Sequence, residues 1–190
     1  MGQDILFLTG FLSAGKSTVG QLLAQRMGVP FLDLDLLLEA RLGRPVEQVL
    51  VEHGELFYRT VEAEILAEVG LRPPCVVALG AGTLTYPRSR EIIRRHGILV
   101  WLAASYEELW RRTEEQERWA RLWLTESLGQ GLPGRETLQE RMKAILDLRL
   151  PQYELADIVV DTTEISPEEA VDQILHQLRI RNFPLLAAGG

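Results

Sequence analysis

Short apolar runs alternate with longer stretches of mixed polarity along this chain. Five of these runs are rich in aliphatic residues and predict strands, at residues 5–8, 31–34, 75–79, 98–102 and 158–160. The segments between them have room for helices, and strands that alternate with helices predict a parallel sheet that is covered on both faces. We therefore expect an α/β fold, a three-layer α/β/α sandwich with a five-stranded parallel sheet. Right-handed crossovers would place a ligand at the carboxyl ends of the strands.

Two helix starts are marked by a pair of polar residues at a fixed spacing. Ser105 stands three residues before Glu108, and Ser166 stands three residues before Glu169. This is the spacing of the capping box, in which the serine hydroxyl and the glutamate carboxylate each accept a hydrogen bond from the other residue's backbone N–H. Both sites predict the N-terminus of a helix.

Residues 10–17 read G-F-L-S-A-G-K-S and fit the phosphate-binding loop pattern G-x-x-x-x-G-K-[ST], directly after the first predicted strand. The glycines permit a tight turn whose N–H groups surround a phosphate, and a helix predicted over 17–27 directs its positive end at that phosphate. Lys16 would reach the β- and γ-phosphates, and Ser17 would offer its hydroxyl to Mg²⁺. The other expected contacts to a nucleoside triphosphate come from Ser13, Ala14, Gly15 and Thr18. A glycine-rich turn without a nucleotide is the alternative, and the flanking strand and helix argue against it.

Composition and charge narrow the possible partners. The 190 residues include 20 basic and 27 acidic ones, and the net charge of −7 argues against a general nucleic-acid binder. The single cysteine, Cys75, cannot form an intrachain disulfide, so we expect a buried thiol and a reducing compartment. The N-terminus lacks a basic leader, and no apolar run approaches 18 residues. We expect a cytoplasmic monomer that binds neither nucleic acid nor membrane.

Two acids follow the second predicted strand. Asp33 and Asp35 are two positions apart, so along an extended chain their carboxylates would project to the same side. One carboxylate of such a pair can hold magnesium while the other orients an alcohol for attack on the γ-phosphate. The alternative is a helix cap, because aspartate is common at helix starts and a helix is predicted from Leu36. The phosphate-binding loop favours the functional interpretation.

Two further segments carry candidate binding groups. Residues 53–62 predict the opening of a long amphipathic helix that brings Arg59 and Glu62 onto one face, where an exposed ion pair is the simplest account. The third predicted strand ends in G-A-G at 80–82, and Gly82 would let the backbone approach a ligand and donate an N–H. A plain turn is the alternative there.

A polar stretch at about 114–135 lacks strand signals and contains several glycines. This composition suits a mobile, hinged lid that could bring an arginine to a transferring phosphoryl group and exclude water. The candidate arginines in and after this stretch are Arg118, Arg121, Arg135, Arg141 and Arg149. We expect one domain over 1–182, with substrate-binding helices at about 35–62, and an irregular tail over 183–190.

Taken in order, these features resemble the shikimate kinase family over nearly the whole chain, from about residue 5 to residue 178. Asp33 and Asp35 match the paired acids of that family. Its stretch G-E-x-x-F-R-x-x-E is partly copied at residues 54–62, where the arginine and the last glutamate are in place. The phenylalanine comes one place early, however, and Tyr58 stands before the arginine.

Three more family motifs are matched with departures. The triple-glycine turn of the family resembles the G-A-G of residues 80–82, which has alanine in the middle. Its lid arginine, followed by P-L-L, resembles Arg121, which is followed by L-W-L. The lid before this residue is longer by about two positions than the commonest pattern, so Arg118 is a rival. The family's R-x-x-x-Y segment resembles Arg149 to Tyr153.

The resemblance implies a P-loop kinase of the nucleoside monophosphate kinase-like type. It implies transfer of the γ-phosphoryl group of ATP to the 3-hydroxyl of shikimate, which gives shikimate 3-phosphate and ADP on the route to chorismate and aromatic amino acids. On the substrate side, Arg59 and Arg149 would bind the carboxylate, Gly82 would donate its N–H, and Asp35 would accept from hydroxyls.

The resemblance also implies the catalytic roles. Lys16 and Arg121 would neutralise charge on the transferring group, and Mg²⁺ would be held by Ser17 and Asp33. Asp35 is the candidate base. A loose transition state needs little proton abstraction, so orientation of the substrate is the firmer role for Asp35.

Two other functions remain open. A gluconate kinase-like enzyme would share the phosphate-binding loop but not the segment from Arg59 to Glu62, and the paired acids and Arg149 argue against it. A regulatory module that binds ATP without turnover is suggested by Ala81 and the altered lid motif. The intact Lys16 argues against that module.

Overall fold

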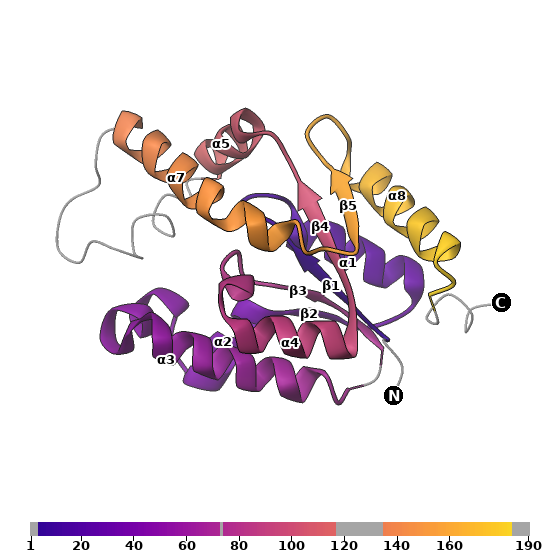
Figure 1. Cartoon of the computed structure of the whole chain (residues 1–190), viewed down its shortest axis with the longest axis horizontal. Helices are drawn as coiled ribbons and strands as arrows, with labels where there is room; N and C mark the ends of the chain where they lie inside the picture. Colours follow the sequence, from indigo (N-terminus) through magenta and orange to yellow (C-terminus); the bar gives the residue numbers. More distant parts are fainter. Residues whose placement is uncertain (1–3, 73, 117–134, 184–190) are drawn as a thin grey trace.

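The structure, a computed structural model, describes residues 4–72, 74–116 and 135–183. Its centre is a sheet of five parallel strands in the order β2-β3-β1-β4-β5 (Figure 1). The strands are β1 (Ile5–Thr9), β2 (Phe31–Asp33), β3 (Cys75–Ala78), β4 (Gly97–Ala103) and β5 (Ile158–Asp161). The predicted parallel sheet is therefore confirmed, and every predicted strand end is correct to within one residue.

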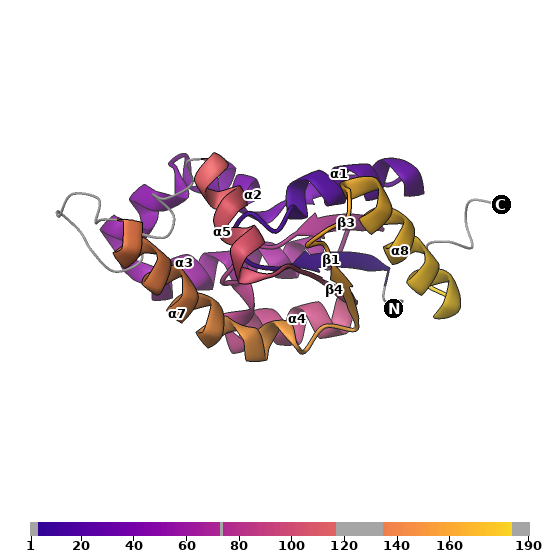
Figure 2. The ribbon, with the colours of Figure 1, turned by 90° about the horizontal axis from the view of Figure 1, so that it is seen from above.

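Helices lie on both faces of this sheet. They are α1 (Lys16–Met27), α2 (Leu34–Leu42), α3 (Val46–Val69), α4 (Pro87–His96), α5 (Tyr106–Glu115), α7 (Arg135–Tyr153) and α8 (Pro167–Ile180), with a 3-10 turn η1 (Thr83–Thr85). Figure 2 shows α1 and α8 on one side of the sheet and α4 on the other. The three-layer α/β/α sandwich is confirmed. Residues 117–134, which hold Arg118, Arg121 and most of the predicted lid, lie outside the described residues.

The continuous apolar runs become the buried centre of the sheet. All five residues of β1 are buried, as expected for a strand with neighbours on both sides and helices on both faces. Cys75 opens β3 as a buried, free thiol, and burial raises the pKa of this thiol to about 11. The prediction of a buried cysteine is confirmed. Within the described residues, no helix is both long enough and apolar enough to cross a membrane.

The two predicted helix starts are both present, and they are capped differently. At α8 the box is complete, because Ser166 and Glu169 each accept from the other's backbone N–H. At α5 only half of it forms: the Ser105 hydroxyl accepts from the N–H of Glu108 at 3.2 Å. The backbone N–H of Ser105 instead donates to Thr163 Oγ1 at 2.9 Å, which ties α5 to the segment after β5.

The Glu108 carboxylate does not complete the capping box and binds arginines instead. It accepts hydrogen bonds from Arg111 and Arg112, and these bonds lower its pKa from 4.5 to about 2. Because the folded state lowers the pKa of Glu108, this carboxylate stabilises the fold at pH values above its unfolded-state pKa. That stability is lost as the pH falls from about 4.5 toward 2. With a discount for the exposed Arg111, we expect Glu108→Gln to lower the free energy of unfolding by about 1 kcal/mol at pH 7.

Thermal unfolding of Glu108→Gln between pH 3.5 and 7 would test this expectation. The difference from the unmodified chain should shrink as the pH falls. Glu107→Gln, an exposed neighbour in the same turn, is the matched control and should show little difference at any pH. A Glu108→Gln effect that does not depend on pH would contradict the assigned ion pairs.

Two helix boundaries differ from the prediction by two residues or more. The helix expected from Leu36 begins at Leu34, so α2 starts directly after β2. The helix expected from residue 53 begins at Val46, and Gly54 interrupts it with φ 78° and ψ 170°, a conformation that favours glycine. Because the chain changes direction there, the part of α3 after Gly54 has its own inward face.

Candidate active site

The phosphate-binding loop occupies the turn between β1 and α1. Gly15 caps α1 with φ 89°, and Gly10 has φ 149°, so both glycines adopt conformations that other residues rarely take. A side chain at Gly10 would also meet the Leu102 carbonyl oxygen at 2.6 Å. Lys16 begins α1, one residue earlier than predicted, and its Nζ donates to the carbonyl oxygens of Gly10 at 3.0 Å and Phe11 at 2.9 Å. The lysine side chain therefore folds back and forms hydrogen bonds within its own loop.

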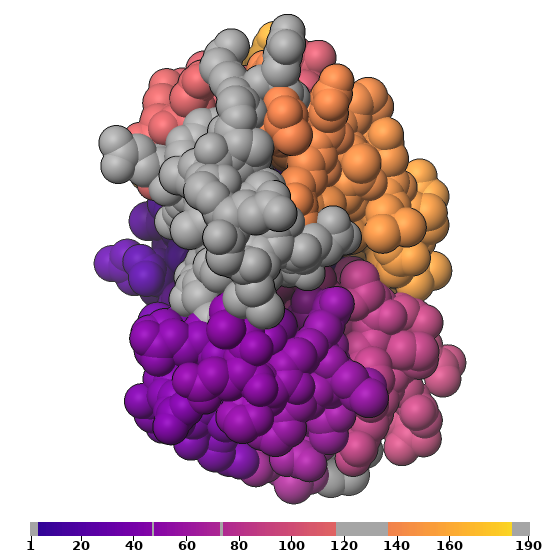
Figure 3. All heavy atoms as spheres, turned by 90° about the vertical axis from the view of Figure 1, so that its left-hand side faces the viewer, coloured from indigo at the N-terminus to yellow at the C-terminus, as the bar shows by residue number. Residues whose placement is uncertain are grey.

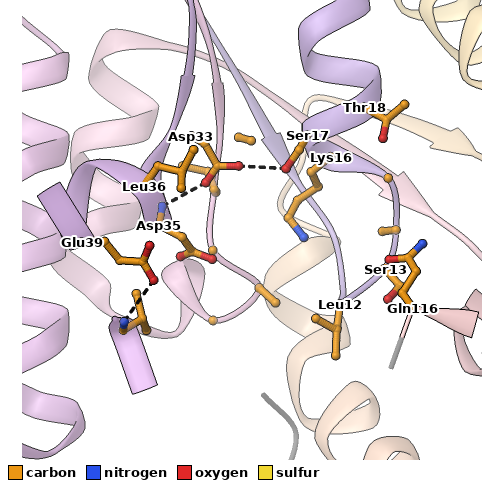
Figure 4. Close-up of a pocket in the computed structure, with 18 of the residues that line it drawn as sticks. Leu12, Ser13, Lys16, Ser17, Thr18, Asp33, Asp35, Leu36, Glu39 and Gln116 are labelled. Carbon is orange, nitrogen blue, oxygen red and sulfur yellow. Dashed lines mark hydrogen bonds between the residues drawn. The ribbon is translucent and has the colours of Figure 1, made fainter. Parts of the chain in front are cut away.

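Asp33 links the end of β2 to the start of α1. Its Oδ2 accepts from Ser17 Oγ at 2.8 Å, and its Oδ1 accepts from the backbone N–H of Asp35 at 3.1 Å (Figure 4). Asp33 is therefore a helix cap and a partner of the phosphate-binding loop at once. The expectation that both carboxylates project from one extended strand is wrong, because Asp35 lies in the first turn of α2. The cap turn still brings Asp35 to the same pocket as Lys16.

The oxygen atoms of Ser17 and Asp33 are suitable ligands for a hard cation. Magnesium in nucleotide sites commonly takes one or two protein oxygens and completes its shell with phosphate oxygens and waters. Among the residues that the structure describes, no three acidic, histidine or cysteine side chains gather into a self-sufficient metal site. The pair therefore fits an ion that arrives with a phosphate chain.

Arg59 and Glu62 form a buried pair, so the simple account of an exposed ion pair is wrong. Glu62 is 0% exposed and Arg59 is 8% exposed. Arg59 Nη1 donates to Glu62 Oε2 at 2.9 Å, and Thr83 Oγ1 donates to Glu62 Oε1 at 2.7 Å. Burial is the largest single effect and would lower the pKa of Arg59, but the combined effect of Glu62, Tyr58 and Glu55, with Glu62 first, raises this pKa. The guanidinium is thus charged and fixed in place.

The turn after β3 brings two arginines together. A Cβ built on Gly82 would overlap Arg59 Nη2 and lie 3.4 Å from Arg149 Nη2, so a side chain at this position would displace the Arg59 guanidinium. A Cβ on Gly80 would lie 3.0 Å from Asp35 Oδ1. The glycines of this turn therefore leave room for the side chains that pack against it, which a plain turn would not require.

Sequence reasoning missed several groups that hold this arrangement. The Tyr153 hydroxyl donates to the Ala81 carbonyl oxygen at 2.7 Å and fixes the turn against α7. The ring of Phe11, a residue of the phosphate-binding loop, lies 5.8 Å from the Arg149 guanidinium. The spacing of Arg149 and Tyr153 was a visible signal. Nothing in the local sequence pointed to Phe11 or Thr83.

The buried Tyr58 was a further omission. Its hydroxyl donates to Asp35 Oδ1 at 3.3 Å, and its ring lies under the Arg59 guanidinium at 4.8 Å. The only sequence signal was its place directly before Arg59, where the family pattern has phenylalanine.

The phosphate-binding loop, the start of α2, Tyr58, Arg59 and the turn after β3 contribute to one pocket of about 470 Å³ at the carboxyl ends of the strands. The predicted site residues that line it are Ser13, Ala14, Gly15, Lys16, Ser17, Thr18, Asp33, Asp35, Arg59, Gly82 and Arg149, whereas the candidate Arg141 is not among its lining residues. Arg121, the predicted lid arginine, lies outside that part. Figure 3 shows the molecule from the side on which α2 and α3 lie at one end and α7 at the other.

A phosphate-binding loop, a hydroxyl–carboxylate pair and a second anion-binding group in one pocket define a P-loop kinase that acts on a small anionic molecule. The family model for shikimate kinase matches residues 12–179 of this chain. The chain therefore belongs to the shikimate kinase family.

Individual relatives agree with this family. The shikimate kinase of Chlorobium chlorochromatii (strain CaD3) is 35% identical over 175 residues, which cover 92% of this chain and 90% of that one. The solved structure of the shikimate kinase from Acinetobacter baumannii in complex with shikimate matches with a TM-score of 0.79 and 30% identity, over 94% of each chain. A gluconokinase from Sinorhizobium meliloti 1021, with a TM-score of 0.61 and 19% identity, shares the fold alone.

Proposed function

We propose that this chain transfers the γ-phosphoryl group of ATP to the 3-hydroxyl of shikimate, with shikimate 3-phosphate and ADP as products. One observation carries the choice of acceptor. The Arg59 and Arg149 guanidiniums converge at Gly82, in the same pocket as the phosphate-binding loop. Two guanidiniums suit a carboxylate, which they can hold with charge-assisted hydrogen bonds. The acceptor is thus a carboxylic acid that presents its hydroxyl to ATP.

On the ATP side, the loop N–H groups and Lys16 would bind the phosphates. Lys16 would exchange the carbonyl oxygens of Gly10 and Phe11, its present partners, for phosphate oxygens. We propose Ser17 and Asp33 as the protein ligands of Mg²⁺, which would neutralise phosphate charge when bound. The lid arginine is proposed to be Arg121.

On the acceptor side, Asp35 would accept a hydrogen bond from the substrate and orient the 3-hydroxyl for in-line attack. The hydroxyl oxygen bonds to the γ-phosphorus, the bond to ADP breaks, and the hydroxyl proton leaves toward the Asp35 side. Because the charge of the transition state lies mainly on phosphoryl oxygens, positioning and electrostatics supply most of the rate enhancement. The Gly82 N–H would add a donor to the carboxylate.

The proposal extends to the setting of the enzyme. We propose that it acts as a monomer in the cytoplasm, where ATP is available, and that its partners are the two substrates, with neither nucleic acid nor membrane. The net charge of −7 supports the exclusion of nucleic acid. Sedimentation of the purified chain would test the monomer.

Gly82→Ala is expected to weaken acceptor binding more than ATP binding. The new methyl group would occupy the position of Arg59 Nη2 and displace this guanidinium from its present place. We expect the KM for shikimate to rise about tenfold or more, because a charge-assisted contact is worth roughly 1.5–3 kcal/mol. The KM for ATP should stay within about twofold, because the phosphate-binding loop does not touch this methyl group. Ala81→Gly in the same turn is the control for a general change of the loop.

ADP release by the purified chain tests the function as a whole. The protein would be supplied with Mg-ATP alone, or with shikimate, gluconate or quinate at equal concentration. We expect release that depends on shikimate. Release with gluconate alone would be consistent with the role of the phosphate-binding loop in ATP binding, but it would contradict the roles of Arg59 and Arg149. Bound ATP without release on any acceptor would favour a regulatory module.

A further inference from the structure

Tyr58 is a buried tyrosine whose hydroxyl reaches into the acceptor end of the pocket. It stands where the family pattern has phenylalanine, so the ring is expected and the hydroxyl is not. The residue is 4% exposed and lies in α3 after the interruption at Gly54. Its hydroxyl is a polar group that this chain places beside Asp35, and the roles proposed above make no use of it.

Tyr58 contacts the side of Asp35 that also faces the turn after β3. Its hydroxyl donates to Asp35 Oδ1 at 3.3 Å, and the same oxygen lies 3.0 Å from a Cβ built on Gly80. From the other direction, Asp33 Oδ1 accepts from the backbone N–H of Asp35. The backbone and the carboxylate of Asp35 are therefore held by different neighbours, and the Tyr58 hydroxyl is one neighbour that holds the carboxylate.

The tyrosine is a fixed donor in this position. Burial, followed by the nearby carboxylates of Asp35 and Glu62, raises the pKa of Tyr58 well above its ordinary value of 10. Its hydroxyl thus keeps its proton at any pH at which the enzyme would work. The Arg59 guanidinium over the ring at 4.8 Å restricts movement of the ring.

We propose that Tyr58 is a positioning residue for phosphoryl transfer: its hydroxyl holds the Asp35 carboxylate in the orientation that receives the acceptor hydroxyl. This inference rests on the proposed function, because it needs Asp35 to act on the acceptor. The distance of 3.3 Å is longer than a typical O–H···O bond. The contribution of the bond should therefore be moderate, and it should act through Asp35.

Tyr58→Phe removes the hydroxyl and keeps the ring. We expect kcat with shikimate to fall about fivefold to tenfold, which is less than a short hydrogen bond to a charged group would give, because this bond is long. The KM for ATP and the KM for shikimate should each stay within about twofold, because the phosphate-binding loop and the two arginines are unchanged. Tyr106→Phe is the matched control: it removes a hydroxyl that donates to the Gln139 carbonyl oxygen at 2.9 Å, away from the pocket, and kcat should not change.

A double-mutant cycle with Asp35→Ala tests whether Tyr58 acts through this carboxylate. Rates would be measured in single turnovers with enzyme in excess over ATP, so that slow transfer stays measurable. We expect Tyr58→Phe to have no further effect once Asp35 is replaced. Equal losses in both backgrounds, or an unchanged kcat in the single variant, would overturn the positioning role. If the unmodified chain itself transfers nothing to shikimate, the proposed function is wrong and this inference fails with it.

Discussion

Lys16→Ala is expected to reduce kcat by about a thousandfold or more, since it removes a charged donor from the transferring phosphoryl group. Lys16 also donates within the loop, to the carbonyl oxygens of Gly10 and Phe11. The positive-φ glycines at 10 and 15 and the buried β1 shape the loop without it. The melting temperature should therefore change by only a few degrees.

The measurement is ADP release with saturating Mg-ATP and shikimate, together with a thermal melt. Lys143→Ala is the matched control, because Lys143 is an exposed lysine that pairs with Asp147 at 2.9 Å, and its loss should leave kcat unchanged. If Lys16→Ala kept its turnover, the proposed role of this loop in phosphoryl transfer would be wrong. A large fall in melting temperature would instead mean that the lysine is needed to build the loop.

The phosphate-binding loop and the sheet were predictable from the sequence because both depend on local patterns. A continuous apolar run such as residues 5–8 has a single good place in an α/β fold, at the centre of the sheet. The loop carries much of its geometry in its own residues, since Gly10 and Gly15 supply the positive φ values that it needs.

Burial of Arg59 and Glu62 could not be predicted from the same kind of pattern. Their spacing predicts only that they share a helix face. Whether that face meets water depends on Thr83 and the turn after β3, which lie about 20 residues further along the chain. The interruption at Gly54, which turns this part of α3, was not predicted from the periodicity either.

The aspartate pair shows two local preferences in competition. Alternation along a strand predicted that both carboxylates share one side, whereas the preference of aspartate for helix caps predicted a turn. The cap won, because Asp33 Oδ1 accepts from the N–H of Asp35 and α2 starts at Leu34. Asp33 still lies in the predicted site, because its second carboxylate oxygen accepts a hydrogen bond from Ser17. One carboxylate serves the fold and the site together.

The two arginines at the acceptor end should respond differently to the same substitution. In Arg59→Met, Glu62 would be left as a buried carboxylate with Thr83 as its remaining partner among the contacts described above. Removal of one member of a buried ion pair costs roughly 3–5 kcal/mol, so we expect this loss in the free energy of unfolding. The KM for shikimate should also rise by about thirtyfold or more, because a charged contact to the carboxylate is lost.

Arg149→Met is the matched variant, because Arg149 is half-buried and lies over the Phe11 ring, a contact worth about 1 kcal/mol or less. We expect a similar rise in the KM for shikimate with little loss of stability. Urea unfolding and steady-state kinetics of both variants would separate the effects. If Arg59→Met alone raised the KM for shikimate, Arg149 would not bind the carboxylate. If both variants lost stability equally, Arg59 would not be needed to balance the buried charge of Glu62. The choice of acceptor would then lose its support, because it rests on an Arg59 guanidinium that Glu62 holds in place.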